Sequence, residues 1–178
     1  MKTLLHITYI TLLLLLTSSM KTDNTFPYLE CTDLHSKEVL LPNDIKGKFS
    51  IIVLAASQKA ESDLQSWMIP LFNDFIADNS KNMFATESYD VNTYFLPVFS
   101  GVTKAAANNI KKKMLKGLDP LLQSHVLIYK GSANKLFQTL ELNKKQAVLL
   151  VLNNNGVIVN KISGGYTEDK MDKIKEAF

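Results

Sequence analysis

The chain has 178 residues, of which 46% are hydrophobic, and its 20 basic and 17 acidic side chains leave a formal net charge of +3. This length and composition suit one domain behind a short leader, with enough apolar residues for a sizeable core, and exclude wholesale disorder. Every basic residue is Lys, and the net charge is small, so the composition argues against nucleic-acid binding and against bidentate capture of phosphate.

The N-terminal 19 residues have the pattern of a secretory signal peptide. Lys2 precedes an apolar run over residues 4–16, and small residues follow it at 17–19. The run is shorter than the roughly 20 residues of an ordinary membrane span. We expect export to a periplasm or the extracellular space, with a linker at 20–25. A leader retained as a short anchor is the alternative and the only route to membrane association.

Cys31 is the single cysteine, so an internal disulfide is excluded and packing must provide the stability. A lone Cys between leucines is typically a semi-buried small hydrophobe, and a reactive thiol is the alternative. Cys31, Asp33 and His35 would share one side of a strand, as a Cys–His pair or a metal spot would need. No orienting partner or metal-ligand spacing accompanies them, and we expect neither a metal nor a cofactor.

Three strands are predicted in the first third of the chain. Residues 26–34 and 37–41 form two short strands around a turn that contains His35. Residues 49–55 (FSIIVLA) are a continuous apolar run rich in β-branched side chains. Such a run is typical of a strand that is covered on both faces.

A long helix, a loop and a further strand are predicted next. Apolar residues recur at helical spacing over residues 60–77, and Pro70 inside this helix predicts a kink because it lacks an N–H. Residues 78–88 are polar and loop-like. Residues 91–99 have strand composition, and Pro97 indicates either the end of this strand or an edge position in the sheet.

A second helix over residues 103–116 carries an apolar stripe, and Lys111, Lys112, Lys113 and Lys116 cover the rest of its surface. Its lysines are typical of a solvated helix face, although a basic face can also meet an acidic partner or a lipid surface. The Asn155-Gly156 pair predicts a hairpin turn. The other predicted elements are a strand at 124–129, a helix at 133–140, strands at 147–152 and 157–162, and a terminal helix at 168–178.

This order of elements resembles the thioredoxin-like fold, and three stretches resemble secreted thioredoxin-like and peroxiredoxin-like proteins. They are FPYLECTDLHSKEVLLPNDIKGKFSIIVLAAS, WMIPLFNDFIA with its proline, and LLVLNNNGVIVNKISGGYTED. The resemblance covers residues 26–178. It implies an α/β domain with a central mixed sheet flanked by helices, a C-terminal β-hairpin and a final helix. Because one fold hosts many functions, it does not imply an activity.

The redox residues of that family are missing. Thioredoxin chemistry needs a Cys at the start of the first long helix and usually another three residues on. Aligned from the preceding strand, these positions hold Lys59 and Ser62; aligned from Pro70, they hold Ser62 and Gln65. The family's cis-proline falls near Ala147. Disulfide exchange and thiol peroxidase chemistry are therefore disfavoured.

The polar residues in this turn have a structural and a functional interpretation. Ser62 and Gln65 match the spacing of a capping box, which would satisfy free N–H groups at the helix start. The functional interpretation is a recognition surface for a protein or peptide. Its candidate binding residues are Ser57, Gln58, Lys59, Ser62 and Ala147.

The leading hypothesis is a redox-inactive, exported thioredoxin-like domain that binds a protein or peptide. One alternative is a thiol oxidoreductase or peroxidase that uses Cys31. The other is an assembly factor or chaperone for a membrane complex. ASQKAES loosely resembles the turn of cysteine-free mitochondrial ATP-synthase assembly proteins with this fold.

Overall fold

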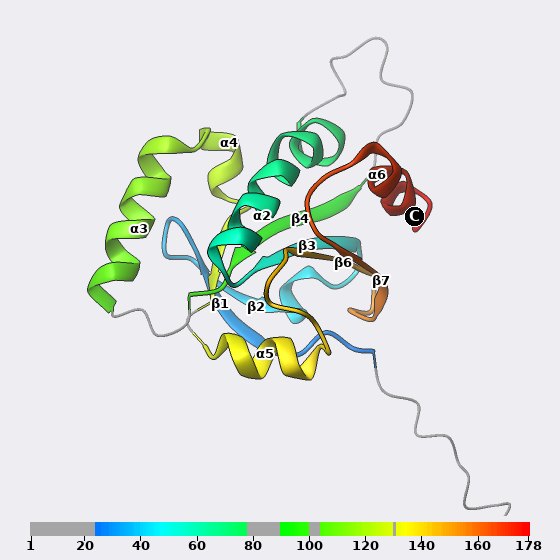
Figure 1. Ribbon diagram of the computed structural model, residues 1–178, viewed down its shortest axis with the longest axis horizontal. Helices are drawn as coiled ribbons and strands as arrows, with labels where there is room; N and C mark the ends of the chain where they lie inside the picture. The colour runs from blue at the N-terminus through cyan, green and yellow to red at the C-terminus, as the bar shows by residue number, and fades with distance from the viewer. Residues whose placement is uncertain (1–23, 78–89, 100–103, 130) are drawn as a thin grey trace, which may run out of the picture.

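The computed structural model describes residues 24–77, 90–99, 104–129 and 131–178, with the backbone alone for 104–107 (Figure 1). The predicted leader and the predicted loop at 78–88 lie outside these residues. The strands are β1 Leu29–Asp33, β2 Glu38–Leu41, β3 Phe49–Ala55, β4 Val91–Pro97, β5 Leu127–Tyr129, β6 Val148–Leu152 and β7 Ile158–Ser163. The α-helices are α2 Gln58–Leu71, α3 Lys104–Gly117, α4 Pro120–Gln123, α5 Ala133–Thr139 and α6 Glu168–Lys175, and a 3-10 turn covers Asn43–Ile45.

The strands form two hydrogen-bonded sheets, with orders β2-β1-β5 and β4-β3-β6-β7. In the larger sheet β3 lies parallel to β4 and antiparallel to β6, so this sheet is mixed. Single parallel bridges from β4 to the β5 segment link the two sheets, at Phe95 with Val126 and at Val98 with Tyr129. The predicted α/β fold with a central mixed sheet is confirmed, and β3 has the predicted bounds.

Both faces of β3 are buried, as its unbroken apolar run predicts. Ile51 and Val53 pack into one core beneath α2, α4 and α6. Ile52 and Leu54 alternate with them and pack into a second core with α5 and β1. In Figure 1, α2 and α5 accordingly lie on opposite sides of the sheet.

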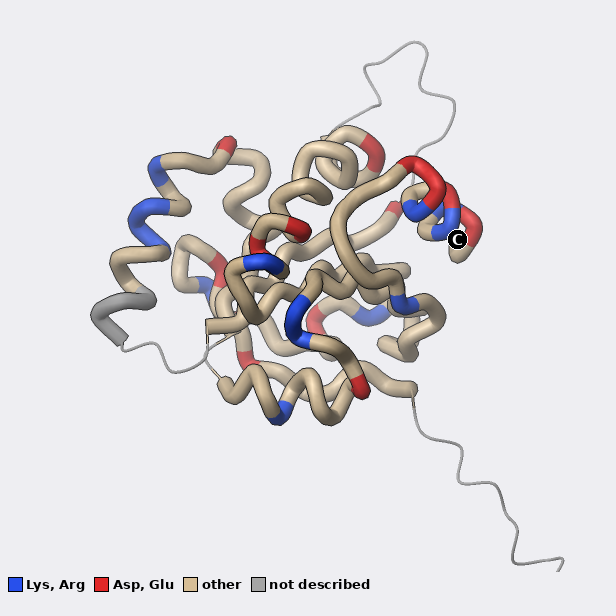
Figure 2. Tube along the Cα trace, in the orientation of Figure 1, with Lys and Arg blue, Asp and Glu red and all other residues tan. Residues whose placement is uncertain are grey.

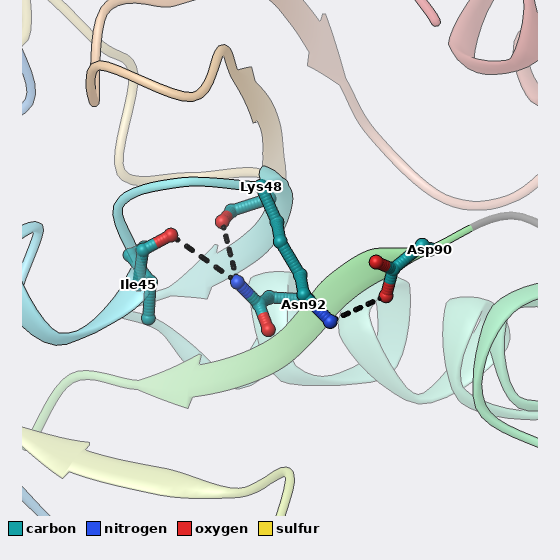
Figure 3. Close-up of polar contacts among 5 residues, drawn as sticks. Ile45, Lys48, Asp90 and Asn92 are labelled. Atoms are coloured by element: carbon teal, nitrogen blue, oxygen red, sulfur yellow. Dashed lines mark hydrogen bonds and ion pairs between the residues drawn. The ribbon is translucent and has the colours of Figure 1, made fainter.

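Polar contacts at the start of β3 hold the parallel register of β3 and β4 (Figure 3). The side-chain amide of Asn92 donates to the carbonyl of Ile45 at 3.2 Å and to the hydroxyl of Ser50 at 3.3 Å. Ser50 is buried and lies opposite Asn92 in the pairing, so the amide satisfies an otherwise isolated hydroxyl. An exposed ion pair between Lys48 and Asp90 lies beside it.

Helix α2 departs from regular α geometry soon after Pro70. A π-helical segment, Phe72–Ile76, follows the α-helical part. Pro70 cannot donate to the preceding turn, so the hydrogen-bonding pattern is weakened just before this change. Pro97 is the last residue of β4, as predicted.

The β6–β7 hairpin forms at the predicted place with a different turn. Only Gly156 has a positive φ, of 79°, and its N–H donates to the Asn153 carbonyl at 2.9 Å. The side chain of Asn153 accepts from the N–H groups of Asn155 and Val157, each at 3.0 Å. Asn155 therefore needs no positive φ, which fits a three-residue loop that ends in a left-handed glycine. Within the described residues, no helix has the length and apolar character that crossing a membrane would require.

Trp67 anchors α2 to the sheet, and its removal tests this packing. The ring is fully buried, and its Nε1 donates to the Gly164 carbonyl at 2.9 Å. We expect Trp67→Phe to lower the free energy of unfolding by about 2 kcal/mol, because the Gly164 carbonyl loses its donor and a gap remains in the core. Ile69→Ala, at an exposed position of the same helix, should change it by less than about 0.5 kcal/mol. Urea unfolding followed by circular dichroism measures both, since Trp67 is the only tryptophan.

Candidate binding surface at the start of helix α2

Helix α2 begins earlier than the sequence pattern predicts. Its N-cap is Ser57, in extended conformation, and the Ser57 hydroxyl accepts from the N–H of Ala60 at 3.2 Å. The predicted capping box at Ser62 and Gln65 is therefore wrong. Ser62 lies inside the helix, where its hydroxyl donates to the Gln58 carbonyl at 3.4 Å. Ser57 is better placed because it directly follows the strand and can adopt the non-helical backbone that a cap needs.

Four of the predicted binding residues lie together on the first turns of α2. Gln58, Lys59 and Ser62 are exposed, and Ser57 is half-buried. Ser57 and Gln58 line a small pocket of about 210 Å³ with the ends of β3 and β4, while Lys59 and Ser62 lie outside it. The structure thus gathers these four side chains at the carboxyl end of the central strand, where open α/β sheets commonly bind ligands.

Ala147 lies against α2 but beneath the surface. It is fully buried, and its N–H donates to Asp63 Oδ2 at 3.2 Å. Its carbonyl accepts from the N–H of Gly164 at 2.8 Å. Both polar groups of its backbone are used inside the chain. Ala147 therefore positions α2 through Asp63, and it offers no hydrogen-bonding group to a partner.

The loop after β7 holds the same helix from its side. The N–H of Tyr166 donates to the hydroxyl of Ser66 at 2.9 Å, and the Tyr166 ring packs edge-on against Trp67 at 5.4 Å. A Cβ on Gly165 would lie 3.0 Å from the Ser66 hydroxyl, so a glycine permits this close approach. The only sequence signal for these contacts is the pair Gly164-Gly165. Neither this loop nor helix α2, taken alone, predicts the contacts with Asp63 and Ser66.

No sulfur occupies the helix start. If the first redox cysteine is placed at the observed N-cap, the two cysteine positions hold Ser57 and Ala60. In the alignment made from the preceding strand, they hold Lys59 and Ser62, which lie within the first turn and a half of the helix. A thiolate stabilised by the positive end of α2 is therefore absent in every register.

Cys31 lies elsewhere and is poorly suited to thiol chemistry. It is on β1, 3% exposed, and packs in the α5 core with Leu29 and Val39. Burial raises the pKa of the Cys31 thiol to about 12, so the nucleophilic thiolate is scarce at neutral pH. A Cys–His–Asp set does not form, because His35 is exposed in the turn and Asp33 accepts the N–H groups of His35 and Lys37 at 2.8 Å. Among the described residues no cluster of His, Cys, Asp and Glu could hold a metal ion.

A second pocket, of about 470 Å³, lies between α2 and α3. Leu64 and Met68 contribute one wall, and Ile110 and Met114 the other. Apolar stripes on both helices are visible in the sequence, but it does not show that the two stripes face each other across a gap.

No protein-family model matches the sequence, and no curated protein sequence does so either. Solved structures, however, resemble the chain over most of its length. The exposed lipoprotein thioredoxin of Streptococcus pneumoniae is 16% identical with a TM-score of 0.58, covering 85% of this chain and 100% of that chain. The thioredoxin domain of a thiol-disulfide oxidoreductase from Bacteroides vulgatus is 13% identical with a TM-score of 0.56, covering 89% and 99%. Copper-bound yeast Sco1 is 18% identical with a TM-score of 0.51, covering 86% and 92%. The chain therefore has the thioredoxin-like fold.

The observed cap leads to a matched pair of substitutions. Ser57→Ala should lower the free energy of unfolding by about 1 kcal/mol, because the N–H of Ala60 loses its acceptor. Ser62→Ala should leave it unchanged within about 0.5 kcal/mol or raise it slightly, since alanine favours the helix interior. Chemical denaturation measures both. The opposite ranking would contradict the assignment of Ser57 as the cap.

The raised pKa of Cys31 predicts slow modification of the folded protein. At pH 8 a thiol of pKa about 12 is about 10⁻⁴ ionised, whereas the unfolded thiol ionises near pH 8.5. Iodoacetamide should therefore label the native chain at least about a hundredfold more slowly than the chain in denaturant. Equal rates would show that the thiol is accessible and activated.

The same pKa sets a pH dependence of stability. Because the folded-state pKa lies above the unfolded value, the contribution of Cys31 is complete below about pH 8.5 and is lost as the pH rises toward 12. Cys31→Ala should therefore destabilise the chain at pH 8 through lost packing and show a flatter decline above pH 9. Denaturation curves of both proteins across this range measure the difference, and parallel declines would contradict it.

Proposed function

We propose that this chain is a redox-inactive, exported thioredoxin-like domain that binds a protein or peptide at the surface formed by the start of α2. One observation carries the proposal: the helix start has a capping serine where the redox chemistry of this fold requires a thiolate. The exposed polar group beside it, Gln58, Lys59 and Ser62, remains available for contact.

The position of the only cysteine also supports redox inactivity. Cys31 is buried in a different sheet, and ionising it is costly. The thiol oxidoreductase alternative would need this residue to reach a substrate disulfide or peroxide. The pneumococcal protein and the Bacteroides domain are described as a thioredoxin and a thiol-disulfide oxidoreductase, but at 13–16% identity they support the fold of this chain alone.

An insulin-reduction assay with dithiothreitol tests the inactivity. The full chain should give the rate of the uncatalysed reaction. The double variant Ser57→Cys with Ala60→Cys should exceed that rate, because it places two thiols at the positive end of α2. Catalysis by the parent that scales with protein concentration and disappears in Cys31→Ser would overturn the proposal.

Binding at the start of α2 is tested by site-specific photocrosslinking in the host cell. A crosslinking amino acid at Ser62, which is exposed and does not cap the helix, should capture a discrete protein partner. The same amino acid at Lys135, on α5 across the sheet, is the matched control. Equal capture at both positions, or none at Ser62, would contradict the proposed surface.

The proposal that the chain is exported is based on the leader pattern of residues 1–19. If the leader is cleaved, the intact mass of the native protein should correspond to a chain that starts near Met20. A full-length mass in a membrane fraction would indicate a retained anchor instead, as a membrane-complex assembly factor would need.

A further inference from the structure

The pocket between α2 and α3 has an apolar interior. Phe95 and Val126 form its floor from the sheet side, and Leu64, Met68 and Met114 are among its walls. Its volume of about 470 Å³ falls in the range of specific binding pockets. Two methionines in facing walls adapt readily to side chains of different shape. The pocket therefore suits a large apolar side chain.

Two exposed apolar side chains lie close in the sequence to residues that line the pocket. Ile69 is 62% exposed and lies one helical turn beyond Gln65, which lines the pocket. Leu121 is 63% exposed and follows the pocket residue Leu118 by three residues. A small molecule held in the pocket would leave both side chains in water. An apolar pocket flanked by exposed apolar residues and a polar rim is instead the anatomy of a protein interface.

The charged side chains that line the pocket are Lys113 and Glu61. Lys113 lines the pocket, and Lys112 and Lys116 are exposed on the same helix, where Figure 2 shows the lysines gathered on α3. None of the three forms an ion pair with a residue that the structure describes. The single carboxylate of the rim is Glu61, on α2. Because α3 carries lysines and no acidic residue, the α3 side of the pocket favours a partner with carboxylates.

We propose that the α2–α3 groove binds an acidic amphipathic segment of a partner protein, with a large apolar side chain in the pocket and carboxylates beside the α3 lysines. The inference rests on the proposed binding function and names the partner's chemistry. Glu61 and Pro97 line both this groove and the small pocket at Ser57, so one continuous surface joins them. A bound segment can therefore extend from the groove to the start of α2.

Two synthetic amphipathic peptides with the same leucine pattern test the proposal on the full chain. One carries Glu at its polar positions and the other Lys. Methyl NMR should show that the Glu peptide shifts the signals of Met68, Met114 and Ile110, while the Lys peptide binds at least about tenfold more weakly. The backbone amides of residues 57–62 report separately on the start of α2.

Variants separate the charge contribution from the apolar one. Lys113→Glu should weaken the Glu peptide about threefold to tenfold, and Lys135→Glu on α5 should leave its affinity unchanged. Met114→Glu, which places a carboxylate in the apolar wall, should weaken it more than about tenfold. Circular dichroism melts confirm that each variant is folded. A Met114→Gln variant replaces it if Met114→Glu does not fold.

Several results would overturn the inference. These are binding of the Lys peptide with equal affinity, no shift at Met68 and Met114 with either peptide, and shifts that appear on concentrating the chain alone, which would indicate a second copy. Binding to phosphatidylglycerol vesicles in place of the peptide would likewise assign the lysines to a lipid surface. Shifts confined to residues 57–62 would overturn the groove and leave the proposed function standing. Insulin reduction by the parent chain would overturn the proposed redox inactivity and leave the groove standing.

Discussion

The burial of β3 on both faces is the constraint on which the rest of this structure depends. Alternate residues of one strand, Ile51 and Val53 against Ile52 and Leu54, belong to two separate cores. Neither core can exist without elements that cover its face of the sheet, so α2 and α6 are required on one side and α5 with β1 on the other. The strand ends at the same edge where α2 begins, and this places Ser57 and its neighbours at a rigid corner of the fold.

That corner is held by polar contacts from segments that are distant in the chain. Asp63 accepts from Ala147, and Ser66 accepts from Tyr166, so the side of α2 near its start is tied to both ends of the β6–β7 hairpin. The fold thus fixes the helix without the help of a disulfide. A surface held in this way loses little conformational entropy when a partner binds, which favours recognition over a need for local rearrangement.

Local sequence patterns predicted the bounds of some elements correctly and those of others incorrectly. The bounds of β3 followed from its apolar run, and the Asn155-Gly156 pair correctly placed the turn between β6 and β7. The start of α2 could not be predicted in the same way, because Ser57 and the capping-box spacing at Ser62 both match a helix start. The position of the cap depends on where β3 ends. The burial of Ala147 and the facing walls of the α2–α3 groove depend on tertiary packing, which no single segment encodes.

Ala147 lies near the position at which the resemblance places the family's cis-proline, and its backbone holds α2 in place. A proline at this position has no N–H, whereas alanine donates one to Asp63 Oδ2 at 3.2 Å. Through this bond to Asp63, Ala147 fixes the loop before β6 beneath α2. With Ser57 as the cap, the N–H of Ala60 at the positive end of α2 already has an acceptor. The capping contact leaves Gln58, Lys59 and Ser62 exposed at the helix start, and Glu61 lines both the small pocket there and the α2–α3 groove.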